Sequence, residues 1–387
     1  MDTIICGETA FDYWRIPPIV QLLLTESDDD RLLLRYVSRD SLAAFRAQAT
    51  QDLALCRKHL VANKATRGSG QTTRQLGKTV PLLAVNHSGP IDVLTTTSIG
   101  HASTLVRAHG LSGEITPGML VPIADGMYVA SVEFTLQQLV TRIGIGKAVM
   151  LGEELCGSFA VYKPPRLIRT FLQSMIDRRG MPRLGGWVPF VDASGRLSDL
   201  WTRPPLTSPH ALSAFAVKTG QCRGRAQLAE VTSLIVSNAA SPFEARLGIL
   251  LGFSRRRGGE GYGGFRYNQE VPLSRDACLL SQRRHCRCDL YWEDAALDLE
   301  CQSSLVHENA GSFLSDSNRA AALGSMGINV LPVTYDQIKD AQRFEALSKT
   351  VARSLGVRFR KKTDLQGAQH EHLRRDVFAN WESLHRL

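Results

Sequence analysis

The stretch Arg287-Cys-Asp-Leu-Tyr-Trp-Glu-Asp-Ala-Ala-Leu-Asp-Leu-Glu-Cys-Gln302 decides the fold of the C-terminal part of this chain. Apolar and polar residues alternate on both sides of its central Glu-Asp pair, which predicts a β-hairpin with a two-residue turn. This register places Trp292 opposite Ala295 and Asp289 opposite Asp298. A four-residue turn with the same centre keeps the same alternation of side chains.

The alternation along this hairpin separates an acidic face from an apolar face. The acidic face carries Asp289, Asp298, Glu300 and Gln302. The apolar face carries Leu290, Trp292, Leu297, Leu299 and Cys301. Like charges that oppose each other on a sheet repel, and a hard divalent cation would hold them together. The acidic face is therefore a candidate metal site.

The segments around the hairpin complete a compact α/β unit. Ser241-Pro-Phe-Glu244 predicts a helix start, because serine caps the helix, proline suits its first position and glutamate closes a capping box. Later elements are expected as strands at about 267–273, 287–292 and 295–302, a helix from Asp316 to Met326, and a strand over 328–334. The order helix, strand, strand, strand, helix, strand predicts an α/β domain with a mixed sheet flanked by helices.

Carboxylates at these positions suit metal-dependent cleavage of a phosphodiester, which needs oxygens that hold Mg²⁺ or Mn²⁺ and leave places for water. Asp289 and Glu300 lie on neighbouring predicted strands, and Glu244 begins the helix over the sheet. These three residues are the candidate metal ligands. Gln302 takes the position where such sites commonly carry lysine, and its amide can position a water without carrying a charge.

The same residues resemble the restriction-endonuclease-like PD-(D/E)xK nuclease superfamily, and more closely the small endonuclease domains related to the very-short-patch-repair (Vsr) mismatch enzymes. The motifs are Ser241-Pro-Phe-Glu244, Asp289-Leu-Tyr-Trp292, Leu297-Asp-Leu-Glu300-Cys-Gln302, His307, Asp316-x-x-Arg319, Leu323, Gly327 and Ile328–Thr334, over about a quarter of the chain. The resemblance implies that Asp289 and Glu300 bind the metal, that Glu244 assists, and that His307 serves in acid–base work.

One departure from the Vsr-like pattern bears on activity. These domains usually carry glutamate, any residue, then aspartate and glycine, whereas this chain has Glu300-Cys-Gln-Ser-Ser304. The second acid of the pattern is missing. Asp298 lies on the same predicted face and could compensate for the missing acid.

The remainder of the chain divides into three predicted regions: residues 1–80 as mostly helical, 81–235 as α+β, and 341–387 as a basic helical C-terminal segment. A long helix is expected over 41–64 and an irregular connector, rich in glycine and proline, over 182–209. The Vsr-like domain is expected over 241–340.

Residues 80–160 resemble the middle region of AbiEi-type antitoxin and regulator proteins. The similar runs are Ile91-Asp-Val-Leu-Thr95, Val106-Arg-Ala-His109, Pro122 and Ser131-Val-Glu-Phe-Thr-Leu136. Those proteins pair a DNA-binding N-terminus with a C-terminal domain that is sometimes of this nuclease type. The resemblance implies a transcriptional regulator, with a cognate toxin or a second subunit as a further partner.

The composition of the chain is basic. The 387 residues carry a net charge of +9, which favours polyanionic partners. The candidate nucleic-acid contacts are Arg255, Arg256, Arg257 and Arg319. The eight cysteines are expected as reduced thiols. No apolar run approaches the roughly 20 residues that cross a bilayer, and no basic segment precedes the first apolar residues, so we expect a cytoplasmic location without membrane partners.

Two functions remain open from the sequence. In the first, a Mg²⁺- or Mn²⁺-dependent endonuclease holds its ion with Asp289 and Glu300, positions water with Gln302, and protonates the leaving oxygen with His307. In the second, a non-catalytic DNA-binding regulator of the antitoxin type keeps a degenerate nuclease-like domain as a scaffold.

Overall fold

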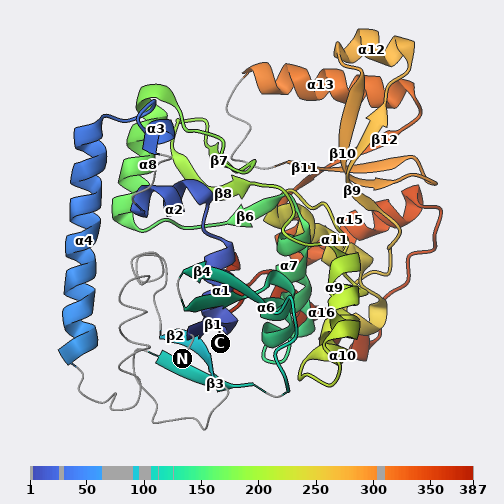
Figure 1. Cartoon of the computed structure of the whole chain (residues 1–387). Coiled ribbons are helices and arrows are strands. Elements are labelled where there is room, and N and C mark those ends of the chain that lie inside the picture. The colour runs from blue at the N-terminus through green and yellow to red at the C-terminus, as the bar shows by residue number, and fades with distance from the viewer. Residues whose placement is uncertain are drawn as a thin grey trace.

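The structure is a computed structural model that describes residues 3–25, 30–62, 90–95, 106–111, 113–124, 126–302 and 310–386 (Figure 1). Within these ranges the chain is an α/β protein, as the sequence predicts, and it contains three sheets. In the same ranges, no helix is long and apolar enough to cross a membrane.

The first sheet has the strand order β3-β2-β1-β5-β4. Its strands are β1 (Thr3–Ile5), β2 (Ile91–Thr95), β3 (Val106–Gly110), β4 (Leu120–Ala124) and β5 (Met127–Ala130). The central strand β1 runs antiparallel to β2 and parallel to β5. Helices α1 (Gly7–Trp14) and α6 (Val132–Leu139) pack together beside this sheet. The sheet thus joins the first residues of the chain to the predicted middle region.

A second group of elements surrounds a small sheet with the order β6-β8-β7. It contains α2 (Pro18–Leu24), α3 (Asp30–Leu33), α4 (Arg39–Ala62), β6 (Phe159–Val161), α8 (Arg166–Arg179), β7 (Val188–Val191) and β8 (Leu197–Thr202). The expectation of an irregular connector over 182–209 is wrong, because β7 and β8 form a hairpin there. Gly195 (φ 81°) makes its turn, and Trp201 is fully buried. The glycines and prolines around these strands obscure the alternation of apolar and polar residues that would predict them.

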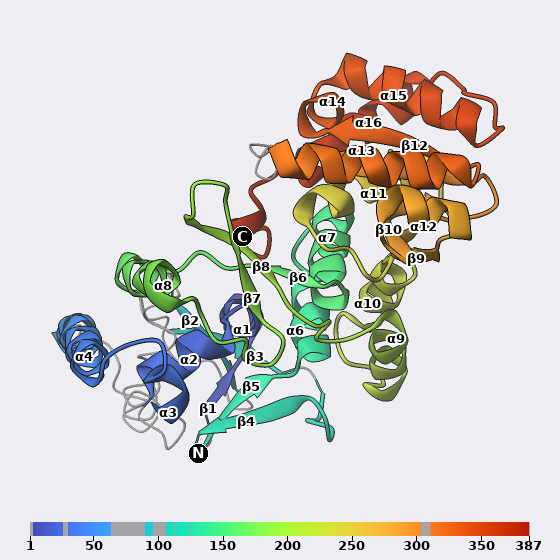
Figure 2. The same cartoon turned by 90° about the horizontal axis from the view of Figure 1, so that it is seen from above.

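Helix α7 (Ile145–Cys156) lies at the centre of the molecule (Figure 2). It contacts α6, α10 (Arg225–Thr232), α11 (Pro242–Gly252) and α16 (Asp364–Val377). Glu154 on α7 is fully buried, and it pairs with Arg15 at 2.6 Å and accepts the indole N–H of Trp381 at 2.6 Å. Arg15 and Trp381, which lie far apart in the sequence, therefore both bond to the central helix α7.

The third sheet has the order β12-β11-β10-β9. It is built from β9 (Arg266–Pro272), β10 (His285–Trp292), β11 (Leu297–Gln302) and β12 (Asn329–Thr334), and the helices around it are α12 (Arg275–Ser281), α13 (Ala310–Ser325), α14 (Tyr335–Lys339) and α15 (Ala341–Ser354). Strands β9, β10 and β11 are antiparallel, and β12 is parallel to β11. Residues of α11 pack on one face, while α13 covers the other.

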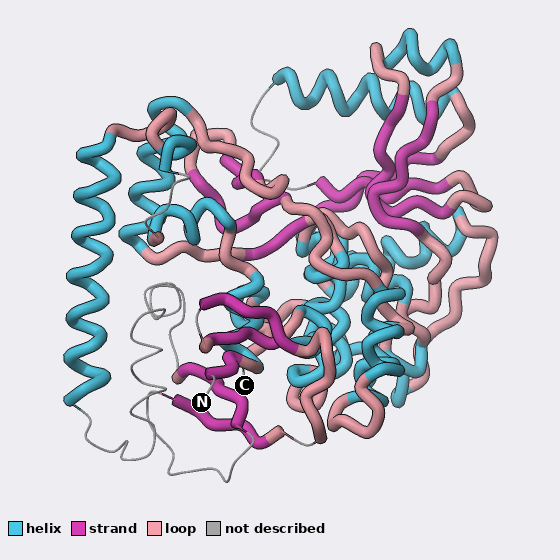
Figure 3. Tube along the Cα trace, viewed as in Figure 1, coloured by secondary structure: helices cyan, strands magenta, loops and turns pink. Residues whose placement is uncertain are grey.

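The predicted element order over residues 241–335 is present, with α12 inserted between β9 and β10. Figure 3 distinguishes the helices, strands and loops of the chain in the view of Figure 1. The sequence predicts that the last helix of this order starts at Asp316. The helix α13 begins earlier, at Ala310, so Asp316 is not its N-cap. The residues Ala310-Gly-Ser-Phe-Leu-Ser315 contain no capping signal as clear as Asp316. Residues 209–218 form α9 (Pro209–Lys218), which packs on α10.

The hairpin at the centre of the third sheet has a longer turn than predicted. Trp292 lies opposite Leu297 and Tyr291 opposite Asp298, so four residues make the connection. Ala296 adopts a left-handed φ of 45° in this turn. The predicted pairing of Asp289 with Asp298 is therefore wrong, because the register is displaced by two residues. A displacement by an even number leaves each side chain of β11 on its predicted face.

Strict alternation along β10 breaks at Asp289. Asn268 on β9 lies between the partners of Cys288 and Leu290 and has a left-handed φ of 50°. Before this point, Cys286 and Cys288 belong to the cluster under α13; beyond it, Leu290 and Trp292 belong to the cluster under α11. Asp289 therefore sits where β10 exchanges its two faces.

Candidate functional site

Asp289 is held between two strands by a backbone hydrogen bond. Its Oδ2 accepts the N–H of Cys301 at 2.8 Å. The side chain is half-buried and belongs to β10, whereas Cys301 follows Glu300 on β11. The carboxylate of Asp289 is thereby fixed beside the second acid of the predicted pair.

Glu244 lies in the first turn of α11 and is 6% exposed. Ser241 caps the helix as predicted, since its Oγ accepts the N–H of Glu244 at 3.2 Å. The Glu244 carboxylate accepts three hydrogen bonds, from Ser241 Oγ (2.8 Å), the N–H of Ala240 (2.8 Å) and Asn268 Nδ2 (2.5 Å). The side chain of Glu244 therefore turns back to Ala240 and across to β9.

The carboxylate of Asp289 acts on two other acids. Burial, and secondly the charge of Asp289, raise the pKa of Glu244 to about 8. The same two causes, in the same order, raise the pKa of Asp298 to about 7. Buried carboxylates this close favour either a bound proton or a bound cation, because their mutual repulsion is poorly screened.

Glu300 faces a different partner. Arg319 on α13 forms a two-pronged contact with it, with Nη1 2.5 Å from Oε1 and Nη2 bonded to Oε2. The same guanidinium lies 3.6 Å from Oδ2 of the fully buried Asp298. Arg319, predicted as a phosphate contact, thus neutralises two carboxylates of β11.

Glu244 and Asp289 are the two carboxylates that remain as candidate ligands of a divalent cation. Magnesium commonly takes one or two carboxylates and completes its shell with water. Across the part of the chain that the structure describes, no three His, Cys, Asp or Glu side chains are placed to share an ion. Glu300 is the third acid of the predicted set. It differs from Glu244 because its carboxylate is paired with Arg319.

Of the two predicted catalytic residues, Gln302 and His307, the structure describes only Gln302. Gln302 is the last residue of β11, half-buried and opposite Thr334 in the parallel ladder. His307 lies outside the described residues. The roles assigned to both stay predictions.

The three consecutive arginines after α11 have different surroundings. Arg255 donates to the carbonyl oxygens of Arg360 and Lys361, both at 2.8 Å, and so ties down the C-terminal segment. Arg257 pairs with Glu230 at 2.8 Å. Arg256 is exposed and is the member of the run best presented to a polyanion.

Two polar residues next to this site were not anticipated from the sequence. Asn268 reaches Glu244, and asparagine is depleted in strands, so its presence inside β9 was an available signal. Glu153 of α7 is buried, accepts the hydroxyl hydrogen of Tyr267 at 3.3 Å, and has a pKa raised well above its usual range by burial. Nothing in the helical pattern of α7 distinguishes Glu153.

No family model, no curated protein and no solved structure matches this chain. The argument for function therefore rests on the site itself. Its main features are the acids of α11, β10 and β11, the element order that brings them together, and the basic charge of the chain.

Proposed function

We propose that the protein is a metal-dependent endodeoxyribonuclease of PD-(D/E)xK, Vsr-like type that cleaves DNA in the cytoplasm. The observation that carries this proposal is the neighbourhood of two acids from different elements. Glu244 is buried and bonded to Ala240 and Asn268, and the charge of Asp289 adds to the effect of burial in raising the pKa of Glu244. Two acids from different elements, held this near each other, suit a shared Mg²⁺ or Mn²⁺ ion.

In this proposal Glu244 and Asp289 hold the ion, and Glu300 is the third candidate ligand. A bound divalent cation supplies an activated water and neutralises charge on the phosphate. Hydrolysis adds a water oxygen to phosphorus and breaks one P–O ester bond, so one proton leaves the water and another reaches the leaving oxygen. Gln302 would orient the water through its amide, and His307 would donate the second proton.

The charge of the chain supports DNA as the substrate. A net charge of +9 attracts a phosphate backbone. Arg256 is exposed within the proposed domain and is the arginine that we assign to phosphate, whereas Arg255, Arg257 and Arg319 already bond to other groups of the protein. Contacts of this kind position the duplex without reading its sequence.

A specific observation favours a second candidate. Glu300 is neutralised by Arg319, and Gln302 brings no positive charge to the position where lysine is usual. Both features suit a degenerate nuclease domain inside a DNA-binding regulator of the AbiEi type, with a toxin or a second subunit as partner.

Nicking of supercoiled plasmid separates the two candidates. The intact protein should nick DNA with Mg²⁺ or Mn²⁺ and stop when a chelator is added. Asp289→Asn, Glu244→Gln and Glu300→Ala should each lower the rate by at least about 100-fold, as expected when a group that binds the catalytic ion is lost. Asp276→Asn on α12, an exposed acid outside the site, is the matched control.

The opposite result would select the regulator. A protein that cleaves no form of DNA with either cation, yet binds promoter DNA, is not the proposed nuclease. Steep weakening of that binding with salt would show only that phosphates are contacted.

A further inference from the structure

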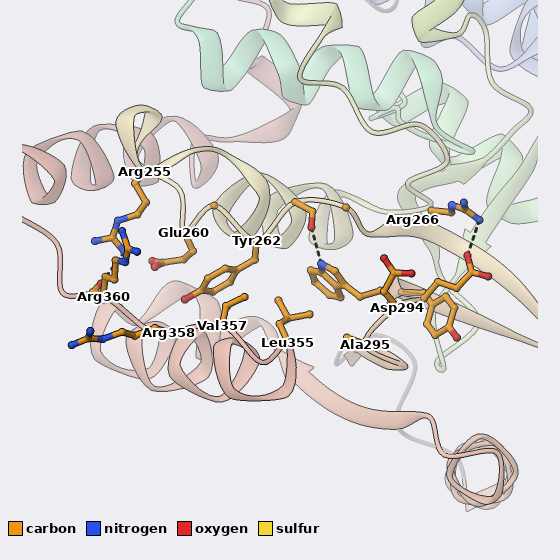
Figure 4. A pocket seen from close by; sticks show the side chains of 16 residues that line it. Arg255, Glu260, Tyr262, Arg266, Asp294, Ala295, Leu355, Val357, Arg358 and Arg360 are labelled. Atoms are coloured by element: carbon orange, nitrogen blue, oxygen red, sulfur yellow. Dashed lines mark hydrogen bonds and ion pairs between the residues drawn. The ribbon is translucent and has the colours of Figure 1, made fainter.

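A cavity of about 610 Å³ lies beside the turn of the β10–β11 hairpin (Figure 4). Its walls come from the glycine-rich loop 258–264, the hairpin turn 293–296, and the segment 355–360 after α15. The volume falls within the range of about 300–1,000 Å³ that is typical of small-molecule sites. The functions proposed above assign no role to this cavity.

One end of the cavity is basic, while the other carries Asp294 beside the ion pair of Arg266 with Glu293 at 3.3 Å. Arg255, Arg358 and Arg360 gather at one end, and Asp294 and Arg266 lie at the other (Figure 4). Arg358 and Arg360 are exposed, so their guanidinium groups are accessible to a ligand. Asp294 is likewise exposed, in the hairpin turn.

An apolar stretch joins the two ends. Tyr262, Val357 and Leu355 follow one another between the arginines and Asp294 (Figure 4). The indole of Trp292 completes this wall, and its N–H is bonded to the carbonyl oxygen of Gly263 at 3.0 Å. A flat, apolar group of a ligand would therefore lie between a cationic end and an acidic end.

The glycine-rich loop leaves its backbone open to the cavity. Gly261, Gly263 and Gly264 are exposed. Gly264 has a φ of 86°, and a Cβ atom added there would meet no atom within 4 Å. A residue without a side chain at this place lets a ligand approach the main chain closely.

We propose that this cavity binds a nucleoside phosphate with a guanine base. Arg358 and Arg360 take the phosphate, since guanidinium groups bind phosphate oxygens in a two-pronged manner. The base lies along the apolar wall, and the carboxylate of Asp294 accepts the adjacent N1–H and N2–H groups of guanine. Arg266 lies at the same end, where it pairs with Glu293 at 3.3 Å, so the carboxylate of Asp294 is the acceptor left for the base.

The choice of guanine follows from the chemistry of a carboxylate, which only accepts hydrogen bonds. Guanine presents two neighbouring N–H donors to it. Adenine and cytosine present one amino group each, and uracil presents a single N–H between two carbonyl oxygens that a carboxylate repels. The order of affinity should therefore begin with guanine and end with uracil.

The inference rests on the proposed function, because it makes the cavity a subsite for one nucleotide of the DNA that is cleaved. Trp292 of the cavity and Asp289 of the candidate metal site are three residues apart on β10, a separation of about 10 Å along a strand. A free nucleotide shares the same chemistry, and the test includes both sources.

Calorimetry on the intact protein with a chelator present tests the assignment without requiring cleavage. The titrants are the 5′-monophosphates of guanosine, adenosine, cytidine and uridine, and two four-nucleotide DNA strands that differ by one guanine. The variants are Arg358→Ala, Arg360→Ala and Asp294→Asn. Arg353→Ala and Asp276→Asn, which replace exposed charges outside the cavity, are matched controls.

Guanosine monophosphate should bind more tightly than the other three nucleotides. Each arginine variant should weaken its binding about tenfold, as expected for one lost charge-assisted contact. Asp294→Asn should remove the preference for guanine, because guanosine monophosphate loses its acceptor and uridine monophosphate is no longer repelled. Tighter binding of the guanine-containing strand than of the monophosphate would identify the strand as the ligand, and equal binding would identify the free nucleotide.

The assignment is overturned if no nucleotide binds at millimolar concentration, or if the three cavity variants bind like the two controls. Plasmid nicking by the same preparations keeps the two proposals apart. Cleavage without nucleotide binding contradicts the cavity alone, and nucleotide binding without cleavage contradicts the nuclease alone.

Discussion

Asp289 on β10 accepts the backbone N–H of Cys301 on β11 through Oδ2, at 2.8 Å. This bond places a carboxylate between two strands at the point where β10 exchanges its faces. The charge of Asp289 raises the pKa of both Glu244 and Asp298, beyond the effect of burial on each. Asp289 is thus electrostatically linked to the acids on either side of the sheet.

Replacing Asp289 by asparagine should lower the pKa of Glu244 and of Asp298. The side-chain oxygen of asparagine can still accept the N–H of Cys301, while the charge that repels the other two carboxylates is gone. Burial should keep both pKa values above their usual range. Titration of the carboxyl carbons by NMR would measure the shifts. Unchanged pKa values at both positions, equal to those in Asp276→Asn, would contradict the link.

The raised pKa of Glu244 predicts a stability that falls as pH rises. Between about pH 4.5 and 8 the folded chain keeps a proton on Glu244 that the unfolded chain has lost. The free energy of unfolding should therefore decrease across this window, by at most about 1.4 kcal/mol per pH unit from this one group. Asp298 contributes in the same direction up to about pH 7.

Glu244→Gln should remove part of that dependence. Its amide can donate to Ser241 Oγ, and its oxygen can still accept from Ala240 and Asn268, so the contacts are largely kept. Urea unfolding with a chelator at pH 5, 6, 7 and 8 would compare the slopes. A variant with the same slope as the unmodified protein would show that Glu244 is ionised throughout.

Part of this site was predictable from the hairpin sequence, and part was not. The two strands, the apolar face of β11 and the helix start at Ser241 all followed from alternation and capping. The register did not, because the turn contains neither glycine nor asparagine, although Ala296 adopts a left-handed φ of 45°. When a residue other than glycine or asparagine adopts a left-handed φ, the sequence does not reveal the turn.

The exchange of faces at Asp289 was also beyond sequence reasoning. It depends on the left-handed φ of Asn268 on the neighbouring strand, and strict alternation assumes that no such residue intervenes. Likewise, the pairing of Glu300 with Arg319 depends on how α13 crosses the sheet, which spacing along the chain does not fix. Tertiary packing therefore determines that Glu300, one of the predicted ligands, is paired with an arginine.

Arg319→Ala should destabilise the fold by about 2–4 kcal/mol at pH 7, because it leaves Glu300 and the buried Asp298 without their cation. The loss should shrink toward pH 5, where the carboxyl groups can bind protons. Chemical denaturation would measure both values, with Arg353→Ala as the exposed control. Adding Glu300→Gln to Arg319→Ala should restore part of the stability. A double variant less stable than Arg319→Ala would contradict the pairing.

Two glycine substitutions should have opposite effects on stability. A Cβ atom at Gly248 of α11 would lie 1.8 Å from the hydroxyl of Tyr267, whereas one at Gly324 of α13 meets no atom within 4 Å. Gly248→Ala should cost about 1–3 kcal/mol through overpacking between α11 and β9. Gly324→Ala should add up to about 1 kcal/mol from helix propensity. Equal thermal stability of the two variants would show that α11 does not lie this close to β9.

The most direct test of a divalent-ion site at Glu244 and Asp289 is Mn²⁺ binding without DNA, measured by electron paramagnetic resonance. We predict one bound ion at pH 8 in the unmodified protein and in Asp276→Asn. We predict affinity at least about tenfold lower in Asp289→Asn and in Glu244→Gln, because each removes one carboxylate ligand. Equal affinity in all four proteins, or binding in none, would contradict the account.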